Sequence, residues 1–257
     1  MNIGSRGRFR LIIRGATLLF RSAVAGAGCL VLTALASGAS RDWAPGIASG
    51  SAWAAPAMTF RLAPTGNLSR CGRRCPLVIV AEGEIRRETP RDFARFIRAN
   101  LRKKRIRAVI LVHSPGGLVV ASMRLGKLFR KLGAAVVVAR LHVPPNGRGR
   151  TIFTAGRCFS ACVYALMGAK KRVVPPQSKL VVHRMFVYEM LGSTDGAAAI
   201  RQKTYGNSKL YRDLTRYARM MGVSSRVIHA AESTPAEEVR VLSQRELRRW
   251  RLAVPRF

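Results

Sequence analysis

The sequence predicts an α/β fold in which helices cover a mostly parallel β-sheet. Short runs rich in valine, isoleucine and leucine alternate with longer segments whose apolar residues recur at helical spacing. This alternation is typical of repeated βαβ units, which place parallel strands side by side. The chain has 257 residues, of which 48% are hydrophobic, so it is long enough to bury one sizeable core.

The expected elements follow one another along the middle of the chain. Strands are predicted at LVIVAE (77–82), AVILVHS (108–114), AAVVVARL (134–141) and KLVVH (179–183), and helices at RDFARFIRANLRKK (91–104) and VVASMRLGKLFRKLG (119–133). A further helix is predicted over 200–222, where tyrosine, leucine and methionine residues recur at helical spacing. Such a stripe usually belongs to a core, and we expect this helix to support assembly or to close the site.

The first 57 residues differ in character from the rest of the chain. Five arginines between positions 6 and 21 precede the small, apolar run SAVAGAGCLVLTALASGA, and Ala-x-Ala cleavage sites follow at 52–54 and 55–57. We therefore expect residues 1–57 to be a signal peptide and residues 58–257 to form a single domain. The alternative is an uncleaved signal anchor in the inner membrane, because about 18 weakly apolar residues are near the minimum for a membrane span. Either way, the folded part is expected to be periplasmic or secreted.

Cysteine usage agrees with export. Four cysteines lie beyond the N-terminal segment, at Cys71, Cys75, Cys158 and Cys162. In an oxidising compartment they suggest two disulfides, whose three connectivities the sequence does not separate. We favour the two local pairs, since a spacing of four on a helix puts Cys158 and Cys162 about 6 Å apart on one face. A zinc site competes with this interpretation, but C-x3-C without well-placed histidines is a weak zinc pattern, and we expect no metal.

The chain is strongly basic, with a formal net charge of +34. Residues 1–57 hold six arginines and one aspartate, so the rest of the chain still carries +29. A charge of this size favours anionic surfaces such as acidic polymers or lipid headgroups, although adaptation to an acidic exterior would give the same composition. The cations are scattered through every expected helix and only 7% of residues are aromatic, so we expect no specific nucleic-acid partner.

Two short segments suggest nucleophilic catalysis. GRCFSACV (156–163) places Ser160 ahead of an expected helix, and His183 ends an apolar strand 23 residues downstream. A serine hydroxyl is a poor nucleophile unless a histidine within hydrogen-bond reach takes its proton. Taken separately, such a serine is more often a helix cap and such a histidine a core residue. Their order and spacing together favour a hydrolase.

A third segment could stabilise the oxyanion that such an attack creates. ILVHSPGG (110–117) ends an expected strand in a Ser-Pro-Gly-Gly turn, where the main chain can approach a substrate without a Cβ in the way. The amide of Gly117 is well placed to donate to an oxyanion. The second donor would be the amide of Ala161, at a helix start where N–H groups are unpaired.

These segments resemble the proteolytic subunit of the Clp protease and its ClpP-like relatives in the crotonase-type superfamily. The resemblance runs through HSPGGLVVASMRLGKLF, GRCFSACVYALMGAKKRVVPPQSKLVVH and LSQREL, and it covers most of residues 77–252. It implies a ClpP/crotonase-like fold with Ser160 as nucleophile, His183 as general base, and Gly117 and Ala161 as oxyanion donors.

The acid of a Ser-His-acid triad is where the sequence departs from this family. The resemblance places Val239 where relatives carry an aspartate, and Glu237 and Glu238 lie within two residues of it. Either glutamate could orient His183 if the loop shifts register, and we take Glu238 as the preferred candidate. The assignment matters because loss of the orienting carboxylate can cost about 10⁴-fold in turnover.

Two functions from different classes follow from these observations. The first is an exported serine hydrolase, a ClpP-like peptidase that acts on peptides or unfolded proteins. The second is a catalytically degenerate ClpP-like module that binds peptides or polyanions, or assembles with itself. Neither needs a cofactor, and the sequence has no phosphate-binding P-loop. Self-association is left open, and no ATPase partner is expected outside the cytoplasm, where ATP is not available.

Overall fold

The computed structural model describes residues 55–101, 108–191 and 200–256. The expected signal segment therefore lies almost entirely outside the described residues. Among the helices that are described, none is both long and apolar enough to cross a membrane. Contacts along the chain group Ser51–Phe257 into one compact unit.

The described residues form eleven strands and eight helical segments. The strands are β1 (Thr59–Pro64), β2 (Leu77–Glu82), β3 (Val109–His113), β4 (Ala135–His142), β5 (Ile152–Ala155), β6 (Arg157–Phe159), β7 (Lys171–Val173), β8 (Lys179–Val182), β9 (Phe186–Leu191), β10 (Ile200–Tyr205) and β11 (Arg240–Val241). The helices are α1 (Leu68–Cys71), α2 (Thr89–Leu101), α3 (Val119–Lys131), α4 (Cys162–Gly168), α5 (Ser208–Met220), α6 (Arg226–Glu232) and α7 (Gln244–Arg249), with a 3-10 turn at Gly72–Arg74.

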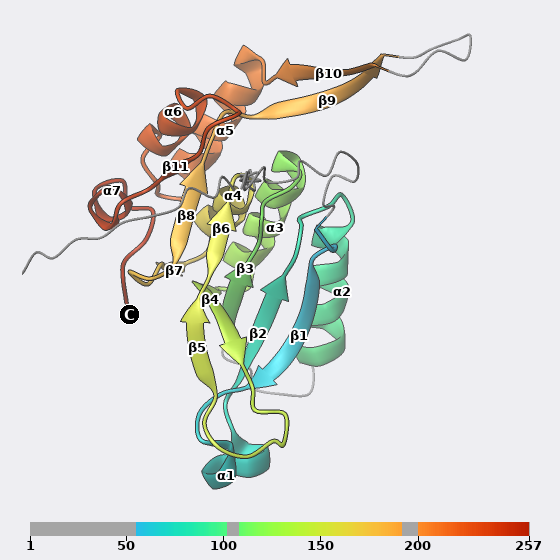
Figure 1. Cartoon of the computed structure of the whole chain (residues 1–257), viewed down its shortest axis with the longest axis vertical. Coiled ribbons are helices and arrows are strands. Elements are labelled where there is room, and N and C mark those ends of the chain that lie inside the picture. The colour runs from blue at the N-terminus through green and yellow to red at the C-terminus, as the bar shows by residue number, and fades with distance from the viewer. Residues whose placement is uncertain (1–54, 102–107, 192–199, 257) are drawn as a thin grey trace, which may run out of the picture. The chain divides into compact units, whose positions relative to one another are not determined.

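The main sheet has a parallel centre and antiparallel edges (Figure 1). β2, β3, β4 and β7 pair in parallel, whereas β1 and β5 run antiparallel to their neighbours. Helices α2 and α3 make the crossovers from β2 to β3 and from β3 to β4. The central residues of β2 and β3 are buried, as expected for strands covered on both faces. The predicted α/β architecture with a mostly parallel sheet is confirmed.

Helices α2, α3, α4 and α5 share one hydrophobic core with the sheet. The rings of Phe93 in α2 and Phe129 in α3 meet edge to face, with centroids 5.1 Å apart. Every residue of α4 is buried, and the Tyr217 hydroxyl of α5 donates to the Tyr164 carbonyl of α4 at 2.9 Å. Helix α4 is thus held from several sides, which fixes the turn that precedes it.

A second, three-stranded sheet carries the segments of catalytic interest. β6 pairs in parallel with β8, and β11 pairs antiparallel with β8 on its other side. An isolated parallel bridge between Ser114 and Cys158 joins the end of β3 to β6. The three segments singled out in the sequence therefore meet where β3, β6 and β8 end.

The prediction of a helix over 200–222 is wrong for the first part of this range. Residues 200–205 form β10, which pairs with β9 in an antiparallel hairpin. Helix α5 begins only at Ser208, where the Asn207 side chain accepts a hydrogen bond from the Leu210 amide at 3.0 Å. This N-cap ends the strand and starts the helix, a boundary that apolar spacing alone does not show.

Both expected local disulfides form. Cys71 is bonded to Cys75 and Cys158 to Cys162, with Cα atoms 4.9 Å and 5.2 Å apart. The geometry of the second pair differs from the prediction, because Cys158 lies in β6 and Cys162 opens α4, so the two do not share a helix.

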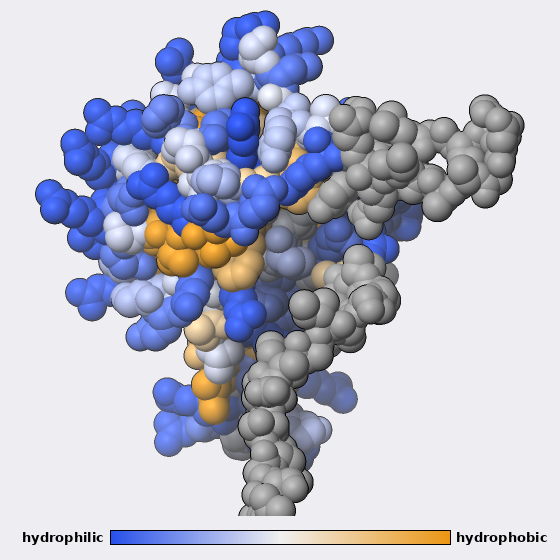
Figure 2. Space-filling view, turned by 45° about the horizontal axis from the view of Figure 1, so that its top comes forward, coloured by the Kyte–Doolittle hydropathy of each residue, from blue (hydrophilic) through white to orange (hydrophobic). Residues whose placement is uncertain are grey.

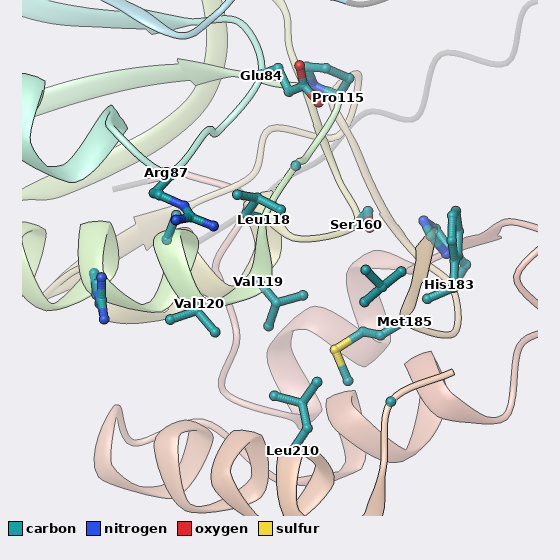
Figure 3. Close-up of a pocket in the computed structure, with 16 residues that line it drawn as sticks. Glu84, Arg87, Pro115, Leu118, Val119, Val120, Ser160, His183, Met185 and Leu210 are labelled. Carbon is teal, nitrogen blue, oxygen red and sulfur yellow. The ribbon is translucent and has the colours of Figure 1, made fainter. Parts of the chain in front are cut away.

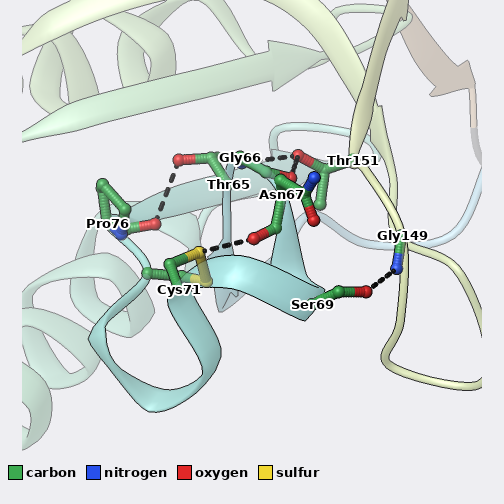
Figure 4. Close-up of a disulfide and its surroundings, with 9 residues drawn as sticks. Thr65, Gly66, Asn67, Ser69, Cys71, Pro76, Gly149 and Thr151 are labelled. Atoms are coloured by element: carbon green, nitrogen blue, oxygen red, sulfur yellow. Dashed lines mark hydrogen bonds between the residues drawn. A yellow bond between two sulfur atoms is a disulfide. The ribbon is translucent and has the colours of Figure 1, made fainter.

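The first disulfide lies in a loop that is tied to a distant segment of the chain (Figure 4). The Ser69 hydroxyl accepts a hydrogen bond from the Gly149 amide at 2.8 Å, and the Thr151 hydroxyl accepts one from the Gly66 amide at 2.9 Å. These hydrogen bonds tie α1 and the residues before it to the segment around Gly149 and Thr151.

Candidate active site

Ser160 lies on a tight turn between β6 and α4. Its φ is 51°, in the left-handed region that a residue with a side chain rarely adopts, and its amide donates to the Val181 carbonyl of β8 at 2.8 Å. A non-glycine residue in this conformation costs about 1–2 kcal/mol, and such strain is found mainly at functional sites. The strand-turn-helix geometry is that of nucleophile turns in hydrolases.

A disulfide spans the turn that carries Ser160. Cys158 and Cys162 flank Ser160 by two residues on each side, and neither has exposed surface. The bond joins the last part of β6 to the first residue of α4. It therefore restrains the backbone that holds Ser160 in its strained conformation.

The Ser-Pro-Gly-Gly loop packs against this turn. The Phe159 amide donates to the Ser114 carbonyl at 3.1 Å, and the Ser114 amide donates to Arg157 at 2.8 Å. A Cβ on Gly116 would come within 2.8 Å of the Phe159 carbonyl oxygen and 3.0 Å of the Ser160 Cβ. Only a glycine allows so close an approach, and the φ of Gly116 is +111°.

The two predicted oxyanion donors differ in access, because Ala161 is fully buried and is not among the residues that line the pocket with Ser160. The Ile85 amide donates to Gly116 at 2.7 Å and the Leu118 amide donates to Ile85 at 2.8 Å, a pattern that passes over the Gly117 N–H. Within the described ranges, no turn or loop hydrogen bond is donated by the amides of Gly117 or Ala161. Gly117 also lines the same pocket as Ser160.

His183 follows the last residue of β8 and faces the hollow that Ser160 lines (Figure 3). Its Nδ1 lies 2.9 Å from the Arg184 carbonyl oxygen. If Nδ1 carries the proton, this contact is a hydrogen bond to the carbonyl and Nε2 is left as the base. No hydrogen bond joins Ser160 to His183 in the part of the chain that the structure describes, and such bonds often tighten only when substrate is bound.

The pocket around these residues has a volume of about 910 Å³ and a largely apolar wall. Leu118, Val119, Val120, Met185, Val187 and Leu210 contribute apolar side chains. Glu84, Arg87 and Arg124 add charges, and Figure 3 shows Glu84 and Arg87 on elements other than those that carry Ser160 and His183. Leu118, Val120 and Val187 are more than half exposed, which leaves apolar surface open to a ligand.

The glutamates nearest the family's acid position lie at the surface. In the antiparallel pairing of β11 with β8, Arg240 is opposite Val182, and Val239 and His183 are the next residues beyond this last pair. Glu237 forms an ion pair with Lys203, whose hydrogen bond holds the pKa of Glu237 below its usual value. Glu238 is exposed, and the structure gives its carboxylate no contact with His183. The assignment of Glu238 stays a prediction.

A partly buried glutamate that the sequence interpretation missed lies beside Arg184, the residue that follows His183. Glu232, the last residue of α6, has a side chain that is 17% exposed, and its Oε2 is 3.9 Å from the Arg184 Nε. Burial raises the pKa of Glu232, while the Met185 amide and the positive charges of Arg184 and His183 act in the opposite direction. The available signal was a lone acid ending the apolar helical run VIHAAE.

His113, the other histidine near the Ser-Pro-Gly-Gly loop, has a structural role. Its Nδ1 accepts a hydrogen bond from the Arg157 amide at 3.1 Å, and His113 does not line the pocket. Burial, followed by the charge of Arg140, lowers its pKa. As for metals, no group of three or more histidine, cysteine or acidic residues among the described positions could hold an ion.

Comparison with known proteins gives structural neighbours only. No protein-family model matches the chain, and no curated protein matches it. Similar solved structures include a mutant of the 1510-N membrane-bound stomatin-specific protease, at 17% identity and a TM-score of 0.41, covering 66% of this chain and 73% of that one. A second mutant of this protease, in complex with a substrate peptide, has the same identity and score and is covered over 69% of its chain.

ClpP1 from Listeria monocytogenes is also similar, at 17% identity and a TM-score of 0.41, covering 66% of this chain and 84% of that one. ClpP-like proteins, the group that the sequence motifs suggested, are thus among the structural neighbours of this chain. At 17% identity these neighbours concern the fold alone, and the function depends on the geometry of the site itself.

Proposed function

We propose that the protein is an exported serine hydrolase, a ClpP-like peptidase that uses a Ser-His pair and an oxyanion hole. The observation that carries the proposal is the strained turn at Ser160, held against the Ser-Pro-Gly-Gly loop and opening into the pocket that His183 lines. A serine that serves only as a helix cap has no need of positive φ or of a neighbouring loop without Cβ atoms.

In the proposed reaction, the Ser160 Oγ attacks a substrate carbonyl carbon while His183 takes the hydroxyl proton. The Gly117 and Ala161 amides donate to the oxyanion of the tetrahedral intermediate. The carbon–nitrogen bond then breaks as His183 returns the proton to the leaving amine, and an acyl ester on Ser160 remains. Water, deprotonated by His183, hydrolyses that ester and frees the serine.

The pocket supports short or unfolded peptides as substrates. Its apolar wall and exposed Leu118, Val120 and Val187 suit apolar side chains of an extended chain. A folded domain would have to unfold locally to enter, and we expect no ATPase to assist it outside the cytoplasm. Rapid cleavage of a stable folded protein would contradict this substrate class.

Export and self-association are part of the same proposal. The two disulfides support an oxidising compartment, since such bonds are rare in the cytosol. Hydrophilic residues cover most of the face shown in Figure 2, with a smaller hydrophobic area near its centre. A basic, hydrophilic surface would suit anionic surroundings. The proposal includes homo-oligomers, which size-exclusion chromatography would detect.

The proposal is tested with a fluorophosphonate probe on the oxidised protein. We expect stoichiometric labelling that is lost in Ser160→Ala and strongly reduced in His183→Gln, with Ser69→Ala, an exposed serine of α1, as a control outside the site. Labelling that persists in Ser160→Ala would exclude Ser160 as the nucleophile.

A degenerate binding module is the second candidate, and one observation favours it. The residue at the position where the sequence resemblance expects the acid is Val239, next to the last pair of β11 with β8, Arg240 and Val182. On this reading the oxidised protein would bind unfolded peptides with equal affinity in the wild type and in Ser160→Ala, and neither would be labelled.

A further inference from the structure

We infer that Glu232 is a positioning residue that stabilises the protonated form of His183, taking the place of the acid that the sequence resemblance expects near Val239. The inference rests on the proposed function, because it assigns Glu232 a role in the same Ser-His mechanism. It differs from the sequence-based choice of Glu238, which is exposed and has no contact with His183 in the structure.

The backbone brings the end of α6 against the segment that follows β8. The Arg184 amide donates to the Thr234 carbonyl at 2.8 Å, and the Arg184 side chain lies 3.9 Å from the Glu232 carboxylate. Glu232 is therefore held beside Arg184 and the Met185 amide, the two residues that follow His183 in the chain. Its negative charge also reaches Tyr164 in α4, the helix that follows the nucleophile turn, where burial first and Glu232 second raise the pKa of the phenol.

The position of Glu232 is unfavourable for folding. Its Oε1 is buried with no hydrogen-bond partner, so the carboxylate has lost water without full compensation. It also ends a helix, where the helix dipole disfavours negative charge. Violations of local rules of this kind are expected at functional sites, where a gain in activity offsets the loss in stability.

The negative charge of Glu232 complements the contact between the His183 Nδ1 and the Arg184 carbonyl. The Arg184 carbonyl lies 2.9 Å from the His183 Nδ1 and can hold the ring in the orientation that leaves Nε2 for Ser160. A carbonyl carries no net charge, however, and the imidazolium formed during the attack needs a negative charge nearby. Arg184 is permanently cationic and lies 3.9 Å from the Glu232 carboxylate, and the charge of His183 also acts to lower the pKa of Glu232, so the carboxylate interacts with both groups while Tyr164 stays neutral.

The decisive experiment measures the coupling directly and does not depend on activity. In the Ser160→Ala protein, with ¹³C-labelled glutamate side chains, the pKa of the Glu232 carboxyl is followed by NMR with and without His183→Gln. We expect it to rise by at least about half a unit when His183 is replaced, because the carboxylate loses a neighbouring cation. His142, the exposed last residue of β4, provides the control, and His142→Gln should leave the pKa of Glu232 unchanged.

A rise at Glu238 instead of Glu232 would overturn the inference, and so would a Glu232 pKa that does not respond to His183→Gln. These outcomes are independent of whether Ser160 reacts, so they separate the failure of this inference from the failure of the proposed function.

The second arm follows the rate of fluorophosphonate labelling against pH in the whole protein. Glu232→Gln should slow labelling about tenfold or more and move its acid limb to lower pH, because the imidazolium loses its neighbouring charge. Glu232→Asp should restore part of the rate, and Glu238→Gln should label like the wild type. A Glu232→Gln protein with the wild-type rate and pH profile would contradict the role proposed for Glu232.

Discussion

Removing the disulfide under Ser160 should affect catalysis and stability together, whereas removing the other disulfide should affect stability alone. Both bonds close loops with a sequence separation of 4, so the chain-entropy model gives each the same stabilisation, about 2 kcal/mol. That amount changes the ratio of folded to unfolded protein by about 30-fold. The double variants Cys158→Ala/Cys162→Ala and Cys71→Ala/Cys75→Ala therefore form a matched pair.

The pair differs in what surrounds the sulfur atoms. Cys158 and Cys162 have no exposed surface, so their replacement also leaves small cavities and should cost somewhat more than the loop entropy alone. Cys71, the last residue of α1, is partly exposed although Cys75 is buried, so the residues around Cys71 can adjust. Urea unfolding with an unchanged m-value measures both losses.

The two disulfides should differ in their effect on the rate of fluorophosphonate labelling. The bond between Cys158 and Cys162 restrains a backbone turn whose strain costs about 1–2 kcal/mol, and without it the turn can relax and move the Ser160 hydroxyl. We expect labelling to slow about tenfold in Cys158→Ala/Cys162→Ala and to be unchanged in Cys71→Ala/Cys75→Ala. Equal labelling in the two variants, with both folded, would refute the clamp.

Three further predictions concern the backbone and the partly buried acid. Gly117→Ala should abolish labelling and destabilise the protein by more than about 3 kcal/mol, because its Cβ would lie 2.1 Å from the Ile85 oxygen. Gly133→Ala should cost only about 1 kcal/mol, because its Cβ would meet open space at a φ of +67°. Urea unfolding compares the two variants, and equal losses of stability would refute the argument. Ser160→Gly should be inactive yet about 1 kcal/mol more stable than Ser160→Ala, since glycine tolerates the φ of 51°; a less stable glycine variant would show that the turn is not strained. Burial raises the pKa of Glu232, so the folded protein binds the proton more tightly and stability falls as pH rises through that range. Glu232→Gln should therefore melt at a higher temperature than the wild type at pH 7 but not below about pH 4, and a gain of the same size at both pH values would contradict this sign.

The sequence predicts the strands that are most buried. The four predicted strands correspond to β2, β3, β4 and β8, because strands inside a parallel sheet need continuous apolar runs that stand out in the sequence. Edge strands have no such requirement. β5 is exposed along its whole length and β6 has only three residues, so neither gives a periodic signal, although β6 carries Ser160 to its position.

The candidate site likewise contains residues that the sequence predicts and one residue that it does not. Ser160, His183 and Gly117 lie in short motifs whose local geometry the sequence encodes, and the structure places all three around one pocket. Glu232 comes from a helix far along the chain, and the contacts of Arg184 with Thr234 and with Glu232 itself connect it to the site. Long-range proximity of this kind depends on how α6 packs, which neither spacing nor composition indicates.

The most direct test of the central claim is to locate the fluorophosphonate adduct by mass spectrometry after reduction and tryptic digestion. Cleavage after Arg157 and Lys170 yields CFSACVYALMGAK, a peptide in which Ser160 is the only serine. We predict one adduct per chain, on Ser160, formed in the oxidised protein and prevented by prior denaturation. An adduct on another residue, or labelling of the denatured chain at the native rate, would contradict the claim that the fold activates Ser160.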